Sequence, residues 1–132
     1  ETSSGAVLLA ALPPAEREAL VRRILASGEA GATRPEIDAR LAAISELGYE
    51  MRASLAVDGC TNISLPVRDH MGATVAALTV PYLPQKRARF SRESVLETTR
   101  MAANEISRAL GAPEQAGRNR AIRLPAAEEQ KR

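Results

Sequence analysis

The sequence predicts an α/β (α+β) domain in which helices flank an antiparallel sheet. Residues 34–47 carry apolar side chains at helical spacing, whereas residues 59–80 have the pattern of a β-hairpin with one apolar face and one face of small polar side chains. Aromatic residues are few, so Ala, Leu, Val and Ile have to form the core, which favours close-packed helices on a sheet. With 132 residues, the chain has the size of one domain.

Two helices are expected near the N-terminus, the first of them short. Residues 4–11, "SGAVLLAA", follow Ser3, and either Ser3 or Ser4 can cap a helix there. The second helix begins at Pro14, because proline suits the first turn of a helix. Its apolar stripe consists of Leu20, Val21, Ile24 and Leu25.

A third helix over residues 34–47 has the clearest boundaries. Thr33 and Glu36 form a capping box, S/T-x-x-E, and Gly48 ends the helix. A longer helix is expected over residues 92–110. Its predicted apolar stripe is Val95, Thr99, Ala102, Ile106 and Leu110.

Three strands follow from the change of period after Gly48. Residues 49–54 alternate, and a hairpin then turns at Asp69-His70-Met71-Gly72. If Arg68 pairs with Ala73, the expected cross-strand pairs are Ile63–Leu78, Leu65–Ala76, Val67–Thr74, Asn62–Thr79, Ser64–Ala77 and Cys60–Pro81. Three strands are few for four helices, so we expect the sheet to be completed by preceding residues or by another chain.

The two faces of this hairpin differ in chemistry. One face carries Ile63, Leu65 and Leu78 and is expected to pack on helices. The other carries Asn62 and Thr79 among small side chains, which is typical of a pocket with a few polar groups. A sheet face half-covered by a loop, with its polar groups satisfied locally, is the alternative interpretation.

Catalysis, metal binding and nucleic-acid binding are not supported by the residue types present. Cys60 and His70 lie at opposite ends of one predicted strand, too far apart for a nucleophile and its base. One cysteine and one histidine are too few ligands for a metal site. The lone cysteine fits a reducing cytoplasm, and a net charge of +2 does not argue for nucleic acid. Residues 113–132 have no sustained period and are expected to form a mobile tail.

Three segments together resemble a known family. They are "SSGAVLLAALPPAEREAL", "RLAAISELGYEMRASLAVDGCTNISLPVRDHMGATVAALTV" and "TTRMAANEISRALGAP". In order and spacing they resemble the effector-binding domain of the IclR family of bacterial transcription regulators, over about residues 3–112. We therefore treat residues 1–112 as a partial effector-binding domain.

The resemblance implies a GAF-like domain that binds a small organic acid on one face of its sheet, without a cofactor. It also implies a homodimer or tetramer, and DNA binding only through an N-terminal winged helix-turn-helix domain that this chain does not contain. The first strands of the effector domain are expected to be absent too. No enzymatic activity is expected.

Residue by residue, the family pattern places the effector at Gly5, Ala6, Arg52, Cys60, Asn62, Thr79 and Pro81. Gly5 and Ala6 correspond to a loop that offers backbone groups to a carboxylate. Relatives that sense short keto acids tend to have an acid at the position of Arg52 and a serine at that of Pro81, which leaves the identity of the acid open. A domain that only oligomerises, without a ligand, is the alternative function.

Overall fold

The computed structural model describes residues 2–28, 31–86 and 89–114, and the structural statements below concern these residues. The elements are α1 (Ser3–Ala11), α2 (Pro14–Ala26), α3 (Arg34–Leu47), β1 (Glu50–Ala53), β2 (Thr61–Arg68), β3 (Thr74–Tyr82) and α4 (Arg92–Ala109). The three strands form one antiparallel sheet in the order β1-β2-β3. The α+β architecture expected from the sequence is therefore confirmed, whereas most of the predicted tail lies outside the described residues.

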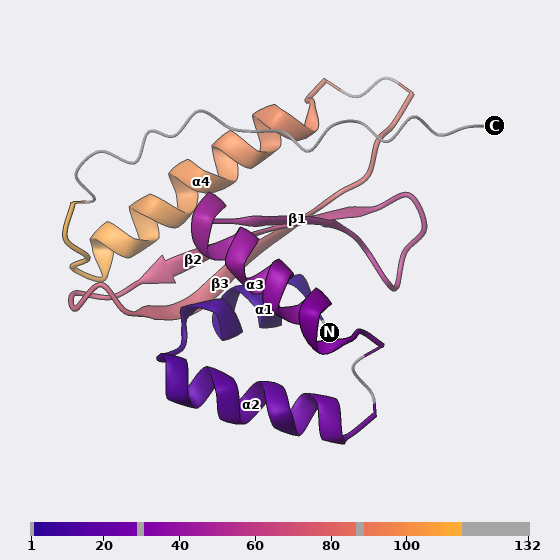
Figure 1. Cartoon of the computed structure of the whole chain (residues 1–132). Helices are drawn as coiled ribbons and strands as arrows, with labels where there is room; N and C mark the ends of the chain where they lie inside the picture. The colour runs from indigo at the N-terminus through magenta and orange to yellow at the C-terminus, as the bar shows by residue number, and fades with distance from the viewer. Residues whose placement is uncertain (1, 29–30, 87–88, 115–132) are drawn as a thin grey trace.

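The sheet is covered by different helices on its two faces (Figure 1). α4 packs on one face against β2 and β3, and α1 packs on the other, with α3 beside it. α2 lies on the far side of α1 and α3, away from the sheet. In the part of the chain that the structure describes, no helix is long and apolar enough to cross a membrane.

The helix boundaries follow local sequence signals closely. α3 begins at the predicted capping box, where the Glu36 carboxylate accepts the backbone N–H of Thr33 at 2.7 Å. It ends at Gly48, whose φ of 77° is a left-handed conformation suited to glycine. At α1 the cap is Thr2 rather than Ser3 or Ser4, because the Thr2 hydroxyl oxygen accepts the N–H of Gly5 at 3.1 Å.

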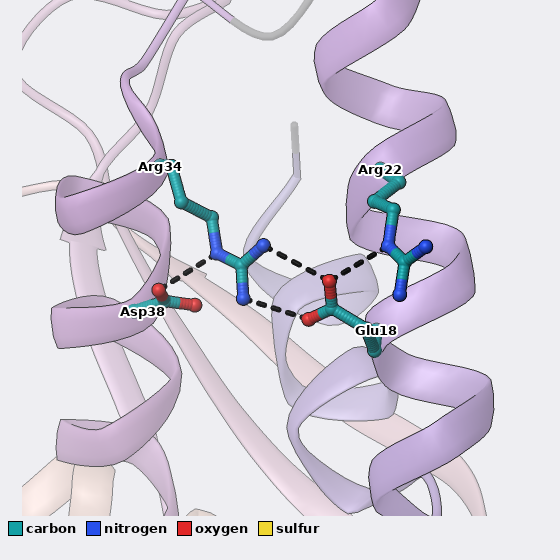
Figure 2. A network of polar contacts seen from close by, with 4 residues as sticks. All are labelled: Glu18, Arg22, Arg34 and Asp38. Atoms are coloured by element: carbon teal, nitrogen blue, oxygen red, sulfur yellow. Dashed lines mark hydrogen bonds and ion pairs between the residues drawn. The ribbon is translucent and has the colours of Figure 1, made fainter.

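A network of ion pairs joins α2 to α3 (Figure 2). The guanidinium of Arg34 donates to both carboxylate oxygens of Glu18, at 3.1 and 2.7 Å, and its Nε donates to Asp38 at 2.7 Å. Arg22 donates to the same Glu18 carboxylate at 2.8 Å. An apolar cluster also joins α1, α2 and α3, through Leu9, Val21, Ile37 and Leu41. In α2, Leu20 was predicted to belong to the apolar stripe, but it is 37% exposed.

The hairpin register differs by two residues from the predicted one. Ile63 lies opposite Val80 rather than Leu78, and Asn62 lies opposite Pro81 rather than Thr79. The first residue of this register difference comes from a longer turn, since Arg68 pairs with Thr74 and not with Ala73. The second comes from a bulge beside Arg68. Each one-residue slip turns side chains to the opposite face, so the two slips together restore the predicted faces.

The apolar face of the hairpin forms the core with α4. The buried side chains of this core are Tyr49, Ile63, Leu65, Val67, Leu96 and Ala103. The stripe predicted for α4 is wrong by about one residue of rotation, because the helix buries Leu96, Thr99, Ala103 and Ser107. Ile106 and Leu110 are 43% and 46% exposed. Ser107 is buried because its hydroxyl accepts the N–H of Arg68 at 2.9 Å and so joins α4 to the end of β2.

Candidate functional site

Three of the predicted site residues form one row across the sheet. Arg52 on β1 lies opposite Asn62 on β2, and Asn62 lies opposite Pro81 on β3. Because cross-strand partners share a face, the side chains of this row lie on the face that α1 partly covers. Asn62 is half-buried, whereas Arg52 and Pro81 are exposed. The row therefore presents a guanidinium, an amide and a proline ring side by side.

Thr79, a fourth predicted site residue, belongs to the neighbouring row. It lies opposite Ser64, and the two hydroxyl oxygens are 2.8 Å apart. Ser64 lies in turn opposite Glu50 on β1. Ser64 is fully buried and Thr79 is exposed, so this hydroxyl pair joins a buried side chain to an exposed one.

Glu50 is held by an ion pair that the sequence did not predict. The Arg40 side chain on α3 donates from Nε and Nη2 to the two carboxylate oxygens of Glu50, at 2.5 and 2.9 Å. Only 14% of the Arg40 side chain and 8% of the Glu50 side chain are exposed. Arg40 Nη2 also lies 3.5 Å from the carbonyl oxygen of Thr2, at the start of α1. One guanidinium thus joins α3, β1 and the N-terminus of α1.

Gly5 and Ala6 lie in the first turn of α1, and their backbone donors have partners there. The N–H of Gly5 donates to the Thr2 hydroxyl at 3.1 Å, and that of Ala6 donates to the Thr2 carbonyl at 3.0 Å. Ala6 is also buried in a small apolar cluster with Val7 and Ile44. In this conformation, the two N–H groups that the resemblance assigned to a carboxylate are used by the helix cap.

The remaining candidates differ in what they offer a ligand. Cys60 is buried, at 4% exposure, one residue before β2. The Arg52 guanidinium is exposed, and within residues 2–28, 31–86 and 89–114 it has neither a hydrogen bond nor an ion pair. His70 lies beyond the other end of β2, far from Cys60. In these same residues, no group of three or more His, Cys, Asp or Glu could hold a metal ion.

The arrangement is suited to holding an anion with polar and apolar parts. Arg52 can donate two parallel hydrogen bonds to a carboxylate, and Asn62 can both donate and accept. The Ser64–Thr79 pair and the Pro81 ring adjoin them. The sequence located this face through side-chain alternation, but it missed Arg40, because no local pattern relates a residue on α3 to one on β1.

Comparison with known proteins agrees with this fold. The model of the bacterial transcriptional regulator IclR C-terminal family matches residues 1–108. A search of the curated proteins found no match.

Solved structures of regulators are similar over most of this chain. The Agobacterium tumefaciens repressor BlcR is 25% identical, with a TM-score of 0.64 over 85% of this chain and 46% of that one. A transcriptional regulator from Rhodococcus sp. RHA1 is 28% identical, with a TM-score of 0.66 over 83% of this chain and 46% of that one. The C-terminal domain of the E. coli transcriptional regulator KdgR is 27% identical, with a TM-score of 0.60 over 83% of this chain and 69% of that one.

This chain spans less than half of the BlcR and Rhodococcus proteins, whereas it spans most of the KdgR domain. The relatives are transcriptional regulators and not enzymes, in agreement with the absence of catalytic motifs from the sequence. Because the family model matches most of the chain, the protein belongs to the IclR family of bacterial transcriptional regulators and carries the C-terminal domain of that family.

Proposed function

We propose that this domain senses a small organic acid in the cytoplasm and controls the DNA binding of a full-length IclR-type regulator. The observation that carries the proposal is the exposed guanidinium of Arg52, which has no hydrogen bond or ion pair within the described residues. It lies in one row with Asn62, on the sheet face beside α1. A sheet face that only packs against a helix has no need of a guanidinium beside an amide. An acid would place its carboxylate on Arg52 and a second polar group on Asn62.

Effector binding would act on the regulator through linked equilibria. An acid that binds one arrangement of a dimer or tetramer more tightly shifts the population toward that arrangement. The winged helix-turn-helix domain of the full-length regulator would then bind its operator with a different affinity. In this proposal the domain performs no chemistry on the acid.

Thermal shift with acetate, pyruvate, succinate and benzoate tests the proposal. A ligand that binds only the folded protein raises its melting temperature in proportion to the logarithm of ligand concentration. Stabilisation by at least one acid is expected in the wild type, and it should disappear in Asn62→Leu and in Arg52→Gln.

The control is Arg23→Gln, which removes an exposed arginine from α2, an element that lies away from the sheet. This variant should retain the stabilisation by the acid. If none of the acids stabilises the wild type, the sensing proposal fails. A stable dimer by light scattering would then favour a domain that only oligomerises.

A further inference from the structure

The charge at the candidate site depends on Glu50, which lies outside the row of Arg52, Asn62 and Pro81. Glu50 lies on the same sheet face as Arg52, two residues before it on β1, and directly opposite Ser64. Side chains two residues apart on a strand are about 7 Å apart. At that separation, a carboxylate without a partner would repel a bound acid and weaken the attraction of Arg52.

Arg40 compensates this carboxylate from the neighbouring helix. Its guanidinium contacts both oxygens of Glu50, and both side chains are largely buried. Burial matters because water screens a charge pair much less in the interior than at the surface. With Glu50 paired to Arg40, Arg52 is the charged side chain of the two rows that has no ion pair within the part of the chain that the structure describes.

We infer that Arg40 is a specificity-determining residue, which makes the face selective for carboxylates by compensating Glu50 and does not itself contact the ligand. The inference rests on the proposed function, since it concerns ligand binding at the same face. Arg40 also approaches the Thr2 carbonyl at 3.5 Å, so it has a structural role as well. The two roles predict different behaviour in a double-mutant cycle.

The experiment measures the affinities of acetate, pyruvate, succinate and benzoate, and of their neutral amides, by calorimetry. The variants are Arg40→Gln, Glu50→Gln, the double variant and Arg40→Lys. Arg40→Gln leaves Glu50 uncompensated and should weaken acid binding about three- to tenfold. Glu50→Gln removes a negative charge beside Arg52 and should strengthen acid binding by a similar factor. The double variant should return to within about twofold of wild type.

Two further results separate charge from shape. Affinities for the amides should be nearly equal in all variants, because an uncharged ligand does not respond to the charge of Glu50. Added salt should reduce the differences between variants for the acids. Arg40→Lys keeps the charge without the planar fork, and it should retain acid binding. If Arg40→Gln does not fold, Glu50→Gln and Arg40→Lys still decide the question.

The inference is overturned if the double variant binds acids as weakly as Arg40→Gln, or if amide binding falls in parallel with acid binding. Either result would assign Arg40 a purely structural role, while the proposed function would stand. If no acid binds the wild type, the proposed function fails, and this inference fails with it.

Discussion

The hydroxyl oxygens of Ser64 and Thr79 lie 2.8 Å apart across β2 and β3, with Ser64 fully buried and Thr79 at the open face. This contact joins the interior of the domain to the candidate site. It also shows the observed register of the hairpin, in which Thr79 lies opposite Ser64, whereas the sequence predicted Asn62 as its partner.

Replacing Thr79 should destabilise the domain because it leaves the buried Ser64 hydroxyl without its hydrogen-bond partner. Thr79→Val keeps the shape and the β-branch, but the buried Ser64 hydroxyl loses its partner, at a cost of about 1 to 3 kcal/mol. Urea unfolding measures the change. Thr74→Val, on the same strand, is the control and should cost less. The explanation is contradicted if adding Ser64→Ala to Thr79→Val brings no relief.

Acid should weaken the attachment of α2 to α3. Hydrogen bonds from Arg34 and then from Arg22 lower the pKa of Glu18 from 4.5 to about 2. Because the folded pKa lies below the unfolded one, this carboxylate contributes stability above about pH 4.5, and the contribution is lost as the pH falls toward 2.

Melting temperature measured against pH tests this. Glu18→Gln should flatten the decline between pH 4.5 and 2 relative to wild type, whereas Glu16→Gln, in an exposed position of the same helix, should leave it unchanged. Equal curves for wild type and Glu18→Gln would show that the network in Figure 2 contributes nothing.

The rotation of α4 can be tested with two leucines. Leu96 is fully buried against the sheet, so Leu96→Ala should cost about 2 to 5 kcal/mol by leaving a cavity. Leu110 is 46% exposed at the end of the helix, and Leu110→Ala should cost less than about 1 kcal/mol. Denaturant unfolding of both variants gives the comparison. The reverse order would support the stripe predicted from the sequence.

A side chain at Gly111 should destabilise the domain, for two separate reasons. Its φ of 82° is a left-handed conformation, and a Cβ there would lie 3.1 Å from the Cβ of His70 at the hairpin turn. Gly111→Ala should therefore cost more than Gly28→Ala, where φ is 72° but no atom of the described residues lies within 4 Å of the added carbon. The conformational part is about 1 to 2 kcal/mol in both.

Thermal unfolding of the two alanine variants measures the difference that the His70 contact adds. His70→Gly should recover that difference in the Gly111→Ala background, since it removes the crowded carbon. If the extra cost persists with His70→Gly, it does not come from contact with the His70 Cβ.

Local signals predicted the elements well because their causes lie within a few residues. The capping box at Thr33 and Glu36 and the left-handed Gly48 both act inside one turn, so α3 begins and ends where the sequence indicated. The cap of α1 was misassigned by one or two residues, because three neighbouring hydroxyl side chains can each cap the helix.

The sequence by itself determined the order of the elements, the family resemblance and the composition of the two sheet faces, because side-chain alternation survives any shift by two residues. Only the tertiary structure decided the register, the rotation of α4 and the pairing of Arg40 with Glu50. Each of these depends on contacts between separate elements. The register depends on a bulge beside Arg68, and the rotation of α4 on the bond from the Arg68 N–H to the Ser107 hydroxyl. The ion pair depends on the Arg40 guanidinium, which reaches from α3 to Glu50 on β1. Such contacts form when the elements pack together, so no local sequence pattern specifies them.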